Sequence, residues 1–79
     1  MKDALHSIVS QIVDHPKEIR VEEEDQDGII QLVIYVKKED MGKVIGKEGK
    51  VIRAIRNVMK IPAMKQNKRI NISLAEVIS

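Results

Sequence analysis

Apolar residues near the start of the chain recur with the spacing of one face of an α-helix. They stand at i, i+3, i+4, i+7 and i+8: Leu5, Ile8, Val9, Ile12 and Val13. Asp3 is a candidate N-cap, because its carboxylate can accept from the first unpaired amides of a helix. Pro16 biases the residue before it away from helical dihedral angles. The pattern therefore predicts an amphipathic helix over residues 5–13, with Asp3 at its start and Pro16 after its end.

The pattern then changes to a period of two. Ile19 and Val21 lead into an acidic run at 22–25, which indicates a half-exposed edge strand kept soluble by charge. Asp27-Gly28 is a strong hairpin signal, because both residues tolerate a positive φ. The strand after it has an entirely aliphatic inner face: Ile30, Leu32, Ile34 and Val36. We therefore expect this second strand at the centre of the sheet.

Two helices separated by glycines are predicted next. Glu39 and Asp40 suit the positive end of a short helix over residues 41–45. Gly46 breaks that helix, and Gly49 begins the next one.

The helix that begins at Gly49 is expected to extend to about Met59. Its apolar residues fall within an arc of about 120° on a helical wheel: Val51, Ile52, Ile55, Val58 and Met59. Pro62 is expected to prevent continuation. The methionines of this half of the chain are interpreted as gap-filling core residues: Met41, Met59 and Met64.

A last strand is indicated by the alternation of Ile70, Ile72 and Leu74. The tight turn between the first two strands requires an antiparallel pair, whereas a two-helix crossover to the last strand suits a parallel one. The sequence thus predicts an α+β fold of order α-β-β-α-α-β. A three-stranded mixed sheet packs against three helices in a single domain over residues 1–79.

The composition narrows the chemistry that this domain can perform. Hydrophobic residues make up 43% of the chain, but Tyr35 is the only aromatic one. A platform of aromatic side chains that stack on bases is therefore excluded. The chain has no cysteine, and its two histidines, His6 and His15, lack a ligand set. We expect no cofactor, no metal site and no catalytic residue, because no serine has a base or glycine elbow near it.

Charge is distributed very unevenly between the two halves. Residues 1–40 carry a net charge of −5, whereas residues 41–79 carry +7. This asymmetry indicates one surface for a polyanion and another turned away from it. Solvated faces of an ordinary small domain would explain the charges equally well if charge were considered alone.

Gly46-Lys47-Glu48-Gly49 lies between the two predicted helices. Gly49 permits close approach of another molecule, because it has no Cβ. The amides that follow begin a helix and favour an anion. Lys43, Lys47 and Lys50 would surround a phosphate there. On the glycine spacing alone, an ordinary helix–turn–helix corner is the better explanation.

A nucleotide-binding P-loop is a second alternative for this segment, and it fails in detail. After Gly42, the P-loop pattern requires glycine and lysine where the chain has Lys47 and Glu48. Val51 follows Gly49-Lys50 where a magnesium-binding hydroxyl would be needed.

The segment 44–52, Val-Ile-Gly-Lys-Glu-Gly-Lys-Val-Ile, followed by Ile55, resembles the VIGxxGxxI signature of KH domains. The helix and strand that precede it resemble the type II, prokaryotic arrangement. Residues 15–21 and 40–46 extend the resemblance to small stand-alone bacterial KH proteins over nearly the whole chain. The resemblance implies an RNA-binding protein, either an RNA chaperone or a post-transcriptional regulator. It also implies pairing with a larger, multi-domain KH protein and a link to cell division or elongation and cell shape.

By position, the resemblance implies that residues 46–49 clamp the backbone of about four nucleotides of single-stranded RNA. Neighbouring residues would form an aliphatic groove or its floor, or attract the strand electrostatically. The candidate RNA-binding residues are Lys43, Val44, Ile45, Gly46, Lys47, Glu48, Gly49, Lys50, Ile52, Arg53 and Arg56. The acid at position 48 predicts modest affinity and strong salt dependence. Which of Val44, Ile45 and Ile52 belong to the core stays open at this point.

A second functional class is a protein-interaction module that forms homodimers or heterodimers with another KH protein. A domain with a thin core gains stability from association. The exposed side of helix 5–13 or the last strand would be the contact surface. No signal sequence or apolar run long enough for a membrane is found, so we expect a cytoplasmic protein without membrane contact.

Overall fold

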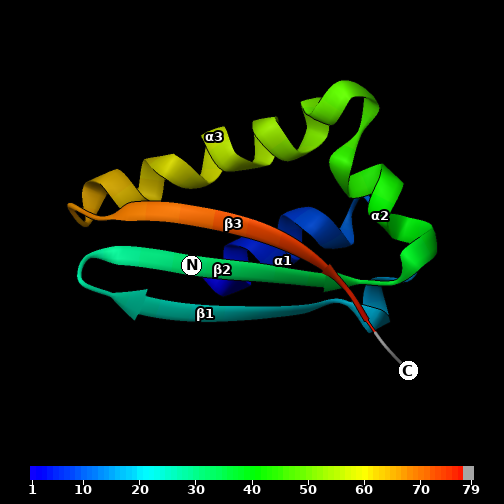
Figure 1. Cartoon of the computed structure of the whole chain (residues 1–79), viewed down its shortest axis with the longest axis horizontal. Helices are drawn as coiled ribbons and strands as arrows, with labels where there is room; N and C mark the ends of the chain where they lie inside the picture. The colour runs from blue at the N-terminus through cyan, green and yellow to red at the C-terminus, as the bar shows by residue number, and fades with distance from the viewer. Residues whose placement is uncertain (78–79) are drawn as a thin grey trace.

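The computed structural model describes residues 1–77 and has the predicted element order (Figure 1). Its α-helices, 3-10 helices (η) and strands are α1 (Lys2–Ser10), η1 (Pro16–Glu18), β1 (Arg20–Gln26), β2 (Ile29–Val36), α2 (Lys38–Ile45), η2 (Lys47–Gly49), α3 (Lys50–Lys65) and β3 (Arg69–Glu76). The α+β prediction with three helices and three strands is therefore confirmed.

The sheet has the order β1-β2-β3, so the aliphatic strand β2 is central as predicted. β1 pairs antiparallel with β2, from Arg20 opposite Tyr35 to Gln26 opposite Ile29. Asp27 and Gly28 connect them with φ values of 54° and 79°, the positive angles that a two-residue hairpin requires. β3 pairs parallel with β2 after the two-helix crossover. Both predicted pairings are confirmed.

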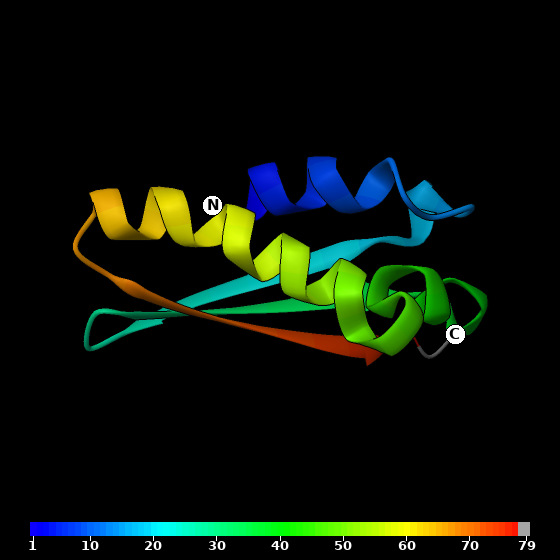
Figure 2. The same ribbon diagram turned by 90° about the horizontal axis from the view of Figure 1, so that it is seen from above.

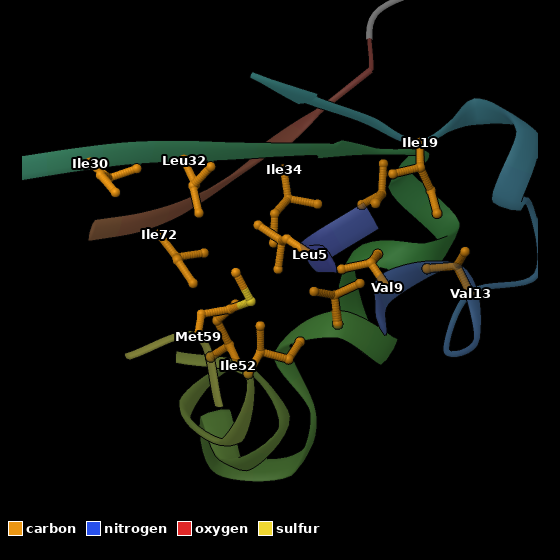
Figure 3. Close-up of a cluster of buried hydrophobic side chains, with 13 residues drawn as sticks. Leu5, Val9, Val13, Ile19, Ile30, Leu32, Ile34, Ile52, Met59 and Ile72 are labelled. Atoms are coloured by element: carbon orange, nitrogen blue, oxygen red, sulfur yellow. The ribbon is translucent and has the colours of Figure 1, made fainter. Parts of the chain in front are cut away.

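The core lies between the sheet and the helices. α1 and α3 cover one face of the sheet, and no helix within residues 1–77 covers the other (Figures 1 and 2). Figure 3 shows side chains from both layers pointing toward one another. The largest fully buried apolar side chains are Leu5, Val9, Leu32, Ile34, Val36, Val44 and Met59. This packing places α2, the start of α3 and hence the loop between them at one end of the sheet (Figure 1).

α1 is shorter than predicted. It ends at Ser10, and Met1 is its N-cap, whereas Asp3 lies inside the first turn. The chain turns because the Gln11 amide donates to the carbonyl of Ile8 in a tighter bond than an α-helix makes. Val13 is still buried, but it lies after the turn at residues 11–12 and not in the helix. The predicted N-cap and the predicted helix end were therefore both wrong.

Asp40 fixes where the chain goes after this turn. Its side chain is only 1% exposed, and its carboxylate accepts from the backbone amides of Asp14 at 3.1 Å and His15 at 3.0 Å. Hydrogen bonds to a charged group contribute about 1.5–3 kcal/mol each. Asp40 thus ties α2 to the segment before η1, a role that its position at a helix start did not reveal.

α3 extends to Lys65 and contains Pro62, although the sequence predicted an end near Met59. The buried side of the helix continues past the proline, because Ala63 is buried four residues after Met59. Pro62 lies in the last turn of the helix, where losing its one amide bond disturbs little that follows.

Two apolar residues predicted to be buried on α3 are exposed. Val58 is 52% exposed and Met64 is 70% exposed. The buried stripe is narrower than the predicted arc and follows Ile52, Ile55, Met59 and Ala63. Val58 and Met64 project about 120° apart on the helix, so apolar side chains are open to solvent at two separate places around α3.

Candidate nucleic-acid interface

The loop between α2 and α3 has the geometry that its glycines predicted. Gly46 caps α2 with φ 76° and ψ 174°, a region that is nearly restricted to glycine. Gly49 precedes α3 in the left-handed region at φ 73°. Glu48 between them is also left-handed, with φ 57°, which is uncommon for a residue with a side chain. The loop thus combines three positive φ angles in four residues.

The two glycines serve different purposes. A Cβ on Gly46 would lie 2.3 Å from Cγ2 of Val51, so this glycine is required for packing inside the loop. A Cβ on Gly49 would meet no atom within 4 Å. The outer surface at Gly49 is therefore open to the close approach of another molecule.

Arg53 holds the loop in this shape. Its Nη2 donates to the carbonyl oxygen of Glu48 at 2.8 Å, and its Nε donates to that of Gly49 at 3.3 Å. The sequence suggested Arg53 as a source of electrostatic attraction along the edge. The structure places its guanidinium on the loop's own carbonyls, where it stabilises the left-handed turn and carries positive charge beside it.

The lysines around the loop differ in what they contact. Lys47 and Lys50 are exposed, as is Glu48. The Lys43 ammonium instead pairs with the carboxylate of Asp14. Hydrogen bonding and charge from Lys43 lower the pKa of Asp14, so this pair persists at neutral pH and is lost only as the pH falls through that lowered pKa. Lys43 is therefore held toward the segment between α1 and η1.

The three aliphatic candidates, Val44, Ile45 and Ile52, differ in whether they are buried in the core or exposed beside the loop. Val44 and Ile52 belong to the hydrophobic core cluster. Ile45 is 39% exposed at the end of α2. Only Ile45 presents an apolar side chain beside the loop, whereas the other two support the loop from beneath.

Arg56 lies two turns into α3 and reaches the outer edge of the sheet. Its Nη2 donates to the carbonyl oxygen of Ile72 in β3 at 3.2 Å. Lys60, one turn further along α3, lines a depression together with Arg56. Lys60 is not among the RNA-binding residues that the sequence predicted. Its spacing of four residues from Arg56 was the signal that the two side chains share one side of α3, with Lys60 further from the loop.

Acidic and basic residues, which lie in different halves of the sequence, also lie on different sides of the folded domain. The acidic run lies on β1, at one edge of the sheet, and the last strand β3 forms the other edge beside the basic side of α3. The surface near the loop, α3 and β3 is thus the basic side of the molecule. Within residues 1–77, no group of three or more candidate ligands is placed to hold a metal ion. The described helices include none that is both long and apolar enough to cross a membrane.

Comparisons with known proteins agree with this geometry. The family model for the KH domain of KhpA/KhpB matches residues 2–74. The RNA-binding protein KhpA of Clostridium acetobutylicum is 45% identical over 74 residues, which cover 94% of this chain and 99% of that protein. KhpA of Halalkalibacterium halodurans is 37% identical over 76 residues, which cover 96% and 100%. A KhpA from Clostridium perfringens is 40% identical over 74 residues, which cover 94% and 99%. The chain therefore belongs to the KhpA/KhpB family of KH domains.

Proposed function

We propose that this protein binds single-stranded RNA, gripping about four nucleotides with the loop Gly46–Gly49. The observation that carries the proposal is the loop itself: a left-handed turn, open at Gly49 and braced by Arg53. Relatives of nearly the same length are named RNA-binding proteins, which supports RNA as the ligand.

The groups around the loop are better suited to contact the phosphate backbone of RNA than to stack on its bases. Amides at the start of α3 favour an anion, and Lys47 and Lys50 add exposed positive charge. Ile45 offers an apolar surface for a base. Tyr35, the one aromatic residue, faces away from the helices, because its neighbours in β2 point into the core. Glu48 opposes a phosphate and keeps the affinity modest.

Fluorescence anisotropy with labelled single-stranded RNA of random sequence tests the proposal. For about four phosphate contacts, the affinity is expected to fall ~50-fold between 50 and 200 mM salt, because binding releases counterions. The same pool as duplex RNA is the control, and we expect it to bind more weakly. Affinity that is absent at low salt, or that does not change with salt, would contradict the proposal.

Within this proposal, the chain acts in the cytoplasm as an RNA chaperone or post-transcriptional regulator. A four-nucleotide footprint carries little sequence information, so selectivity for particular transcripts requires a second module that adds avidity. A larger KH protein of the KhpB type would supply such a module.

The second candidate function is association with another KH domain, and the exposed apolar side of α3 favours it. Val58 and Ile61 are 52% and 57% exposed and lie one turn apart. At 100° per residue, Val58 projects about 160° away from Arg56. An apolar surface opposite the basic one would let protein association and RNA binding occur together.

Size-exclusion chromatography with light scattering tests this association. The chain alone, or mixed with a KhpB-type protein, is expected to give a complex. Val58→Gln/Ile61→Gln is expected to remain monomeric, because it removes the apolar contact from a surface that the fold does not need. Ile45→Gln, an exposed apolar position beside the loop, is the control and should still associate. A parent chain that is monomeric in both samples would contradict the second candidate.

A further inference from the structure

We propose a second nucleotide subsite at the α3–β3 turn, which takes a later base and phosphate of the RNA strand held by the loop. The inference rests on the proposed function. A depression of about 300 Å³ lies where α3 ends and β3 begins. That volume is at the lower limit for small-molecule sites. It is far from the loop, since α3 rises about 21 Å between Lys50 and Met64.

The walls of this depression combine the groups that a nucleotide requires. Met64, Ala63 and Ile70 make an apolar surface, and the flexible thioether of Met64 can adapt to a flat base in a chain without available aromatics. Met64 is also the most exposed of the large apolar residues described. The exposed side chain of Met64 does not contribute to the core. Contact with an RNA base would explain why an apolar residue stands at this exposed position.

Polar groups stand at the rim. Asn71 is exposed on β3 and lines the depression, and its amide can both donate to and accept from a base edge. Lys60 and Arg69 are exposed and supply positive charge for a phosphate. The ammonium of Lys68 is paired with Asp25 and is less available. Among the described residues that line this depression, none is acidic.

A continuous path joins this subsite to the loop. A second depression of about 290 Å³ shares Lys60, Ile70 and Asn71 with the first and extends to Arg56 and Ile72. Its lining residues come mostly from α3 and β3, two elements that run side by side between the α3–β3 turn and the loop end of the sheet (Figure 1). The same strand of RNA can therefore follow one basic side of the molecule. An acidic peptide would also be attracted by the positive charge of these depressions. It would not, however, require the apolar surface of the first depression or a path from it to the loop.

Random-sequence RNA pools of four, six, eight and ten nucleotides test the inference by anisotropy. Longer pools offer more binding registers, so each affinity is divided by its number of registers. We expect the corrected affinity of the decamer to exceed that of the tetramer by about tenfold, because an added base and phosphates are contacted.

Two groove variants are expected to remove this gain while leaving the tetramer within about twofold of the parent. Lys60→Gln/Arg69→Gln removes the two exposed cations and lowers the salt slope for the decamer by about 1.4. Met64→Ser removes the apolar floor without changing charge and should lower decamer affinity ~5-fold. Because all three side chains are exposed, circular dichroism should match the parent.

Lys2→Gln/Lys17→Gln is the matched control, since it removes the same charge from α1 and η1. It should affect all lengths slightly and equally. The inference is overturned if the corrected affinity does not rise with length, or if the groove variants reduce tetramer and decamer by the same factor. A parent that binds no pool at all would instead overturn the proposed function.

Discussion

A variant carrying Lys47→Asp and Glu48→Asp is expected to lose RNA binding while keeping the parent fold. The change takes the two loop side chains from a net charge of zero to −2, at the point where a phosphate would lie. Two like charges 4 Å apart repel by about 1 kcal/mol in water and about 4 kcal/mol near a protein surface. We therefore expect the affinity to fall at least ~100-fold.

The fold should persist because both side chains are exposed and aspartate tolerates the left-handed conformation of position 48. The bonds from Arg53 are made to backbone carbonyls and do not depend on these side chains. Anisotropy with the tetranucleotide pool measures the loss, and thermal unfolding checks the fold.

The chain contains a matched control for this variant. Lys17 and Glu18 are an identical exposed pair in the other 3-10 helix, η1. Lys17→Asp/Glu18→Asp changes the net charge by the same amount. It should reduce binding only slightly, because its added negative charge repels the RNA from a distance and salt screens that repulsion. If the two double variants bind RNA equally well, or the loop variant binds like the parent, the loop is not the site.

Gly46→Ala is expected to have the largest effect on stability of any alanine substitution in the loop. Its backbone angles are nearly restricted to glycine, and the new Cβ would overlap Val51, which lies in the first turn of α3. Strain and overpacking together should cost about 2–5 kcal/mol of unfolding free energy. For a chain of this length, Tm should fall by about 10 °C or more.

Comparison with Gly49→Ala separates the cost of the steric overlap with Val51 from the cost of a positive φ. The φ of Gly49 is also positive, but a Cβ there meets open space, so only the left-handed cost of about 1–2 kcal/mol applies. Urea unfolding of both variants gives the two free energies. A Gly49→Ala variant as unstable as Gly46→Ala would show that packing against Val51 does not matter. Gly49→Ala should nevertheless weaken RNA binding, because it obstructs the open side of the loop.

The parts of the fold that the sequence predicted well depend on local signals. The inner face of β2 follows from strict alternation, and the hairpin follows from Asp27-Gly28, which needs only its own backbone angles. The parallel pairing of β3 follows from the length of the crossover. The positions of Gly46 and Gly49 at helix ends were predictable for the same reason.

What the sequence did not reveal depends on neighbours that are distant in the chain. Lys43 meets Asp14 across 29 positions, and Asp40 meets His15 across 25. A helical wheel shows which residues share a side but not how wide the buried stripe is, so Val58 was placed wrongly. Val44 and Ile45 are adjacent, and only the docking of α2 determines which of them is buried.

The bond from Arg56 to Ile72 has a further consequence, which concerns solubility. β3 is an edge strand, and its unpaired backbone groups are a template on which another chain can add a strand. The guanidinium of Arg56 donates a hydrogen bond to one of these carbonyl oxygens, that of Ile72. Its positive charge at the edge also disfavours the addition of a strand from another chain. Arg56 therefore protects this edge of the sheet from aggregation. Loss of Arg56 would leave this edge open to a strand from another chain.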